Sequence, residues 1–134
     1  MRAGGGKNHR FALYDGVLIK DNHLKACGGV HAAVSRARAQ AHHLLAIEVE
    51  VETLEQALEA VDAGADCLLL DNMEDVQLQE VLEALGGRVR TEASGNMTVA
   101  RLERLRAKGI FPDQVSIGGL IHQSKWADLS LEFD

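Results

Sequence analysis

The chain has 134 residues, enough for one domain, and 46% of them are hydrophobic, so it can bury a core. Its net charge of −6 argues against a general nucleic-acid binder, because contact with a phosphate backbone usually needs a basic face. The sequence shows no signal peptide and no apolar stretch that could span a membrane. Its two cysteines, Cys27 and Cys67, form no disulfide or zinc pattern, so we expect a protein of the reducing cytoplasm.

Five short apolar runs along the chain each end in a polar or glycine-rich group. These runs are Val17–Lys20, Ala46–Val51, Cys67–Asp71, Val89–Gly95 and Val115–Gly119. Helical patterns lie between them, and this alternation of strands and helices predicts an α/β fold with a parallel sheet. Because parallel strands end at the same edge of a sheet, the five terminal groups should converge in space.

The segments between the runs predict a loop at 21–29 and then four helices. A capping box at Thr53–Gln56 marks the start of the second helix: the Thr53 hydroxyl accepts from the Gln56 N–H, and the Gln56 side chain reaches back. The expected apolar stripes are Val30, Ala33, Val34 and Ala37; Leu54, Ala57, Leu58 and Val61; Val76, Val81, Leu82 and Leu85; and Val99, Leu102 and Leu105. Near the end of the chain we expect Trp126 to anchor packing and residues 127–134 to form a closing strand or a cap.

The second predicted strand alternates apolar and acidic residues, with glutamates at positions 48, 50 and 52. A parallel strand buried on both faces reads as a continuous apolar run. The alternation therefore indicates one face packed on helices and one face turned to a polar interior. Three glutamates cannot all be buried without partners, so this interior is either wet or lined by cations.

Charged groups end two of the other strands. Lys20 could form a Schiff base, hold an anion by its charge, or simply cover apolar surface with its stem. Asp71 ends the most apolar strand in the chain, and an acid at that place in a barrel is more often functional than structural. Upstream, Lys7, His9 and Arg10 form a compact cationic group suited to carboxylates.

Two glycine-containing loops are candidates for phosphate binding. Ser94-Gly95-Asn96 and Gly118-Gly119 each lie where a strand ends, and glycine lets a backbone N–H approach an anion closely. Ordinary turn formation is the alternative explanation for either loop alone. The presence of both favours phosphate binding, because the last loops of barrel enzymes often have this role.

Together these strings resemble one enzyme family, quinolinate phosphoribosyltransferase (nicotinate-nucleotide diphosphorylase, carboxylating). The matching strings are GGGKNHR, LYDGVLIKDNH, IEVEVETLEQ, LLLDN, ASGN, SIGGL and DLSLEFD, and they cover essentially the whole chain. The resemblance implies an N-terminal α/β sandwich followed by an open six-stranded α/β barrel, working as a dimer. Residues 1–134 would then be one truncated barrel domain with five of the six strands, lacking the sandwich domain and the first barrel strand. Because two strand edges would be unpaired, a flat doubly wound sheet of flavodoxin type is the structural alternative.

The resemblance also implies an activity and roles for individual residues. The family transfers the phosphoribosyl group of phosphoribosyl pyrophosphate to quinolinate and releases carbon dioxide, giving nicotinate mononucleotide and diphosphate, with Mg²⁺ bound to the diphosphate. It implies that His9, Arg10 and Lys20 bind quinolinate, and that Lys20 is also catalytic. Glu50 and Asp71 would be catalytic and would contact the ribose and the Mg²⁺-diphosphate. The 5′-phosphate would be bound by Ser94, Gly95, Asn96, Gly118 and Gly119.

Three other interpretations stay open at this point. The chain is a non-catalytic or designed half-barrel that oligomerises or rearranges, an aldolase-like barrel with a Schiff base at Lys20, or a relative of the family, such as its molybdenum-associated homologue, with another substrate. The intact KDNH segment at 20–23 favours quinolinate. For the leading interpretation we expect the small-molecule substrates quinolinate and phosphoribosyl pyrophosphate, no nucleic-acid or membrane partner, a homo-oligomer, and poor catalysis by the isolated chain.

Overall fold

The computed structural model describes residues 4–125 and 128–132 of the chain. Five parallel strands form one sheet, and they follow one another across the sheet in chain order. The strands are β1 (Val17–Ile19), β2 (Ile47–Val51), β3 (Cys67–Asp71), β4 (Arg90–Ser94) and β5 (Gln114–Val115). All five predicted strands are therefore confirmed, although β5 has only two residues.

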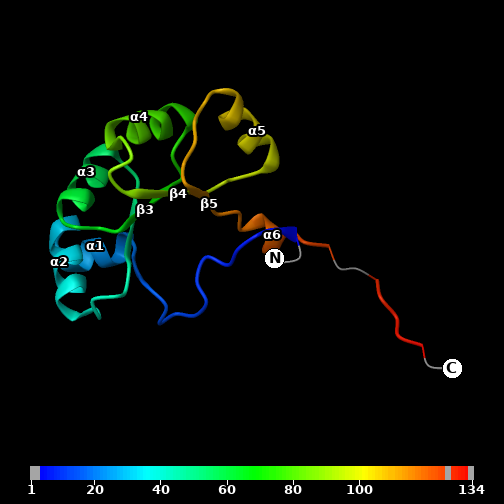
Figure 1. The fold of residues 1–134 in the computed structure, drawn as a ribbon, viewed down its shortest axis with the longest axis horizontal. Helices are drawn as coiled ribbons and strands as arrows, with labels where there is room; N and C mark the ends of the chain where they lie inside the picture. Colours follow the sequence, from blue (N-terminus) through cyan, green and yellow to red (C-terminus); the bar gives the residue numbers. More distant parts are fainter. Residues whose placement is uncertain (1–3, 126–127, 133–134) are drawn as a thin grey trace.

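The connecting helices lie along one side of the curved sheet (Figure 1). They are α1 (Asp21–Cys27), α2 (Val30–Gln40), α3 (Leu54–Asp62), α4 (Asp75–Leu85) and α5 (Val99–Ala107), with the short α6 (Gly119–His122) after β5. Strands in consecutive order with helices on one side form part of a barrel wall. A flavodoxin-type sheet has the order 2-1-3-4-5 and helices on both faces, so that alternative is wrong. The sheet is open, because β1 and β5 are its two edges.

The core lies between the sheet and these helices. In β2, Ile47, Val49 and Val51 are completely buried, whereas Glu48 and Glu50 on the opposite face keep a small exposed fraction. The prediction of one apolar face and one polar face is thus confirmed. Leu68 and Leu70 of β3 continue the apolar face. Each such aliphatic side chain stabilises the fold by about 1.5–3 kcal/mol when buried.

The predicted loop at 21–29 is wrong, because residues Asp21–Cys27 form helix α1. Lys20 is its N-cap residue, and the Lys20 backbone N–H donates to Nδ1 of His23 at 2.9 Å. Lys25 and Asp21 form an ion pair of 2.9 Å one turn apart, and Gly28 ends the helix with φ of 86°. Only Leu24 of this helix is buried, so the sequence carries no apolar periodicity that could reveal it.

Two predicted stripe residues also lie outside the core. Val76 and Val99 are 78% and 68% exposed, because each lies in the first turn of its helix, before the stripe reaches the sheet. The Thr53 cap is confirmed: its hydroxyl accepts from the Gln56 N–H at 3.2 Å. The return contact is shifted by one residue, since Gln56 Oε1 accepts from the backbone N–H of Glu52.

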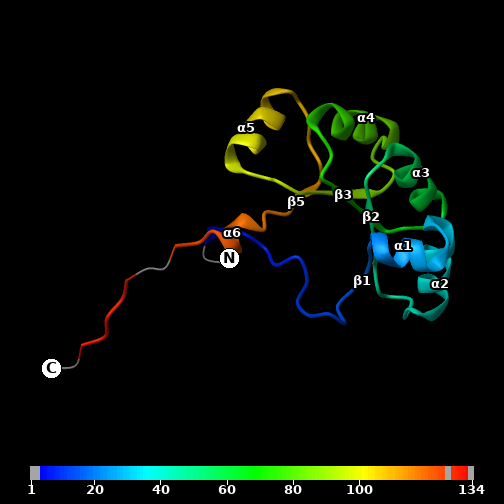
Figure 2. The same ribbon diagram turned by 180° about the vertical axis from the view of Figure 1, so that it is seen from behind.

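The chain after α6 leads away from the sheet (Figure 2). Residues 128–132 form neither a helix nor a strand, so they do not provide the predicted closing strand. Trp126 and residues 127, 133 and 134 lie outside the described residues. Within the described part of the chain, every helix is too short or too polar to cross a bilayer.

Candidate functional site

The polar face of the sheet brings the first two predicted groups into contact. Ile19 pairs with Val49, so Lys20 and Glu50 follow side by side at the carboxyl edge. Lys20 Nζ lies 3.2 Å from Glu50 Oε2. The Glu50 side chain is 12% exposed and that of Lys20 is 52% exposed, so the carboxylate is largely withdrawn from water while the ammonium remains accessible.

The next two predicted groups meet at the same edge. Asp71 pairs with Ser94 in the register of β3 and β4. Asn72, which the sequence analysis did not single out, ties them together: its backbone N–H donates to the Ser94 carbonyl at 3.1 Å, and its side-chain amide donates to Asp71 Oδ2 at 2.6 Å. Asn72 adopts φ of 53°, a left-handed conformation that asparagine tolerates better than most residues.

The predicted phosphate loop after β4 is packed tightly against this asparagine. Gly95 has φ of +81°, and a Cβ atom at Gly95 would lie 2.2 Å from Asn72 Oδ1 and 2.8 Å from Asn72 N. Asn96, with φ of 51°, donates from its side chain to Asn72 Oδ1 at 3.4 Å. Glycine is therefore required at position 95 for both conformation and space.

A partly buried ion network between α4 and α5 holds the loops after β3 and β4. Arg101 of α5 donates to the Gly95 carbonyl at 3.0 Å and to the Met73 carbonyl. It also pairs with Asp75 of α4, and both of these side chains are about one-tenth exposed. Hydrogen bonds from Arg104 and then Lys108 hold the pKa of Asp75 well below its ordinary value. The sequence missed this network because no local spacing links residue 75 to residues 101–108.

The other predicted phosphate loop lies past β5. Gly118 and Gly119 begin α6, and their carbonyls accept the hydrogen bonds of its only turn. Gly118 has an ordinary φ of −60°, so its backbone does not demand glycine. Ser116 is joined to β4 by a backbone bond to Ala93 of 2.9 Å, which places this loop next to the one at Gly95.

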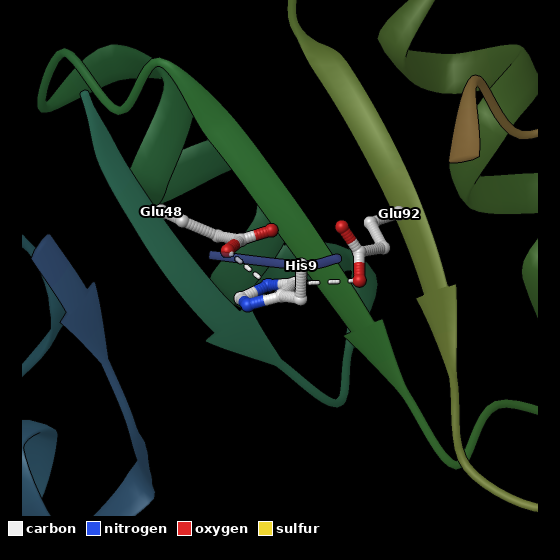
Figure 3. A group of neighbouring side chains, drawn as sticks. All are labelled: His9, Glu48 and Glu92. Carbon is white, nitrogen blue, oxygen red and sulfur yellow. Dashed lines mark hydrogen bonds and ion pairs between the residues drawn. The ribbon is translucent and has the colours of Figure 1, made fainter. Parts of the chain in front are cut away.

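His9 reaches the polar face from the segment before β1. Its Nε2 lies 2.9 Å from Glu48 Oε2 and 3.6 Å from Glu92 Oε1 (Figure 3). Arg10 follows it and is half-buried. Glu92 was missed as a functional residue, although it occupies an inward position in β4 as Glu48 does in β2; the same alternation of side chains could have revealed it.

Cys67 lies on the polar face between these two acids. Its thiol donates to Glu48 Oε1 at 3.4 Å. Burial, followed by the charge of Glu48, raises the pKa of Cys67 to about 12. The Cys67 side chain is thus half-buried and hydrogen-bonded.

The thiol of Cys67 should consequently react slowly with alkylating reagents. With a pKa of about 12, only about one thiol in ten thousand is ionised at pH 8. We expect iodoacetamide to label Cys67 at least about a hundredfold more slowly in the folded chain than in the chain unfolded in urea. Peptide mass spectrometry after timed quenching measures both rates, and equal rates in the two states would contradict the assigned environment.

Comparison with known proteins identifies the family of this chain. Residues 1–132 match the family described as quinolinate phosphoribosyl transferase, C-terminal domain. The chain is 43% identical over 132 residues to a probable nicotinate-nucleotide pyrophosphorylase [carboxylating] of Bacillus subtilis, covering 98% of this chain and 45% of that protein. It is 37% identical over 149 aligned positions to quinolinate phosphoribosyltransferase [decarboxylating] 1 of Nicotiana glauca, covering 98% of this chain and 42% of that protein.

A solved structure gives the same result for the fold. The crystal structure of NadC from Streptococcus pyogenes superposes with a TM-score of 0.88 at 44% identity, covering 98% of this chain and 46% of that one. The chain thus spans less than half the length of these relatives. The open five-stranded sheet and the predicted family are both confirmed, and the chain belongs to the quinolinate phosphoribosyl transferase family, matching its C-terminal domain.

Proposed function

We propose that this chain carries the barrel part of an enzyme that transfers a phosphoribosyl group from phosphoribosyl pyrophosphate to quinolinate, with loss of carbon dioxide. The products are nicotinate mononucleotide, diphosphate and carbon dioxide, in the biosynthesis of NAD. The names of the relatives support this reaction class. The observation that carries the proposal is the carboxyl edge of the sheet: Lys20 and Glu50 are in contact there, and Asp71 and the loop that contains Gly95 lie farther along the same edge.

The charges on this edge suit both substrates. Quinolinate is a dianion, and the accessible ammonium of Lys20, with His9 and Arg10 before it, offers it cationic partners. Phosphoribosyl transfer passes through a cationic, oxocarbenium-like state at the sugar. Fixed carboxylates such as Glu50 and Asp71 stabilise such a charge where water is largely excluded. The two glycine-containing loops would hold the 5′-phosphate through backbone N–H groups.

The oxygen donors at this edge suit a magnesium ion that is bound to the diphosphate of the substrate. Mg²⁺ prefers oxygen ligands, and it is commonly held by one or two carboxylates together with substrate phosphates. Glu50 and Asp71 would supply those carboxylates, and the bound ion would neutralise the diphosphate that leaves. Among the described residues, the one group of three ligands close enough to hold an ion by themselves is His9, Glu48 and Glu92, so Glu50 and Asp71 depend on the substrate to complete a site.

Replacing Lys20 by methionine tests the assignment of the quinolinate site. Loss of a charge-assisted contact of about 1.5–3 kcal/mol should weaken quinolinate binding by about ten- to a hundredfold. The control is Lys25→Met, which removes a nearby and more exposed lysine of α1 that pairs with Asp21. Isothermal titration with quinolinate measures both variants. Equal quinolinate affinities in the two variants would show that Lys20 is not part of the quinolinate site.

Turnover and assembly are measured in the same preparation. Nicotinate mononucleotide formation is followed chromatographically with both substrates and Mg²⁺, and sedimentation gives the mass in solution. We expect a homodimer, because both sheet edges are open and Phe11, Leu13 and Tyr14 are more than three-quarters exposed before β1. A chain that binds neither substrate at millimolar concentration would instead support the second candidate, a non-catalytic barrel fragment that associates through these edges.

A further inference from the structure

Two carboxylates on the polar face of the sheet converge on one imidazole ring. Glu48 comes from β2 and Glu92 from β4, and their side chains are 14% and 6% exposed. His9 comes from a segment far away in sequence, and its Nε2 faces both acids (Figure 3). One ring atom is therefore shared by two acids from two different strands.

The register explains why the acids need a shared partner. Glu48 pairs with Cys67 and Glu92 pairs with Leu69, so β3 lies between them, the two positions are staggered by two residues, and their backbones are about 12 Å apart. Both carboxylates lean toward the middle, where like charges repel each other. The Cys67 thiol donates to Glu48 and the Ser116 hydroxyl donates to Glu92, but neither group carries a positive charge. His9 is the group that can supply one.

Hydrogen-bond chemistry then determines the state of the ring. An ionised carboxylate only accepts hydrogen bonds, so the Nε2 atom that contacts Glu48 must carry a hydrogen. Among the described residues, His9 makes its side-chain hydrogen bond through Nε2, and none is formed by the other ring nitrogen, Nδ1. When the ring is charged, Nδ1 also bears a hydrogen and can donate it to an anion.

We propose that Glu48 and Glu92 are positioning residues for His9: Glu48 accepts its Nε2 hydrogen, Glu92 lies 3.6 Å from the same atom, and together they orient the ring across β3 and leave Nδ1 as the atom that meets a carboxylate of the ligand. This inference rests on the proposed function for the identity of that ligand, a pyridine dicarboxylate. It adds two acids to the site whose own contacts with substrate are not required. Their effect is transmitted through the orientation and the tautomer of His9.

A divalent cation is the competing occupant of the same place. The ligand atoms of His9, Glu48 and Glu92 all lie within 4.8 Å of one another, which is compatible with one ion. The separation of 2.9 Å between Nε2 and Glu48 Oε2 is that of a direct hydrogen bond, and Glu92 already accepts from Ser116. These contacts favour the positioning role.

Nitrogen NMR of the ring tests the proposal directly. In the chain labelled with ¹⁵N-histidine, the signals of His9 are assigned by their loss in His9→Gln. We expect a protonated Nε2 in the wild type and a shift of Nδ1 when quinolinate is added. Glu48→Ala should move the Nε2 signal toward the tautomer-averaged value of a free histidine. Glu92→Gln, which retains the bond to Ser116, should produce a smaller change in the same direction.

Calorimetry separates positioning from general damage. Glu48→Ala should weaken quinolinate binding about tenfold and leave the affinity for phosphoribosyl pyrophosphate within about twofold. Glu103→Gln, an exposed acid on α5, is the charge-matched control and should change neither affinity. Thermal melting of each variant shows whether it folds. If Glu48→Ala fails to fold, Glu92→Gln gives the same two readouts.

The outcomes are distinct. A His9 spectrum that is identical in wild type and Glu48→Ala overturns the positioning role, whether or not quinolinate binds. A spectrum that responds to Glu48→Ala in a chain that binds no quinolinate supports the positioning and rejects the proposed ligand. Stoichiometric binding of Zn²⁺ or Mn²⁺ that is lost in Glu48→Ala and His9→Gln identifies the three groups as a cation site and overturns the proposal.

Discussion

Replacing Gly95 by alanine should disrupt the loop after β4 and abolish binding of phosphoribosyl pyrophosphate. The new Cβ would lie 2.8 Å from the backbone nitrogen of Asn72, and no side-chain rotation can relieve that contact. The residue would also be held at φ of +81°, which costs an alanine about 1–2 kcal/mol. Together we expect a loss of about 2–4 kcal/mol in the free energy of unfolding.

Gly87→Ala is the control for this experiment. Gly87 has a similar φ of +76°, but a Cβ atom added there meets no atom within 4 Å. It should show the conformational cost alone, about 1–2 kcal/mol, with phosphoribosyl pyrophosphate affinity unchanged. Chemical denaturation and isothermal titration measure both properties. Equal results for the two variants would mean that the contact between Gly95 and Asn72 does not shape the ligand loop.

Removing the carboxylate of Asp75 should give the largest loss of stability outside the apolar core. Asp75→Ala leaves Arg101, whose side chain is 11% exposed, without its ionic partner. Breaking a buried pair on one side costs about 3–5 kcal/mol. Because Arg101 also donates to the carbonyls of Gly95 and Met73, the loops after β4 and β3 should loosen as well. Glu80→Gln, an exposed acid on the same helix, should leave stability within about 0.5 kcal/mol.

The contribution of Asp75 should depend on pH in a defined direction. Hydrogen bonds from Arg104 and Lys108 depress the pKa of this carboxyl in the folded chain, while the unfolded chain takes up the proton near pH 4. The stabilisation is therefore fully present above about pH 5 and is lost as pH falls further. The difference in free energy of unfolding between wild type and Asp75→Asn should shrink between pH 6 and pH 2. A difference that is constant over this range would contradict the assigned ion network.

Much of the architecture could be predicted because it depends on patterns of residues that are close together in the sequence. Apolar runs with polar ends predicted all five strands, and the alternation in β2 correctly predicted one packed face and one polar face. The cap at Thr53 was also local, since donor and acceptor are three residues apart. Helix α1 was missed because it buries only Leu24 and relies on its cap and a surface ion pair.

The residues of the candidate site also fall into two groups, those that local patterns predict and those that they do not. Lys20, Glu50, Asp71 and Ser94 could be predicted as a group, because parallel strands place their carboxyl ends on one edge whatever the remaining contacts are. Local patterns could not predict the roles of Asn72 and Arg101 or the convergence of His9 on two acids. Each depends on contacts between residues more than twenty positions apart, such as Arg101 with Met73 and Asp75, and only the curvature and register of the folded sheet bring those atoms within bonding distance. Local patterns determined the strands of this protein and the polar groups gathered at one edge of its sheet, and tertiary structure alone decided which side chains hold that edge in shape.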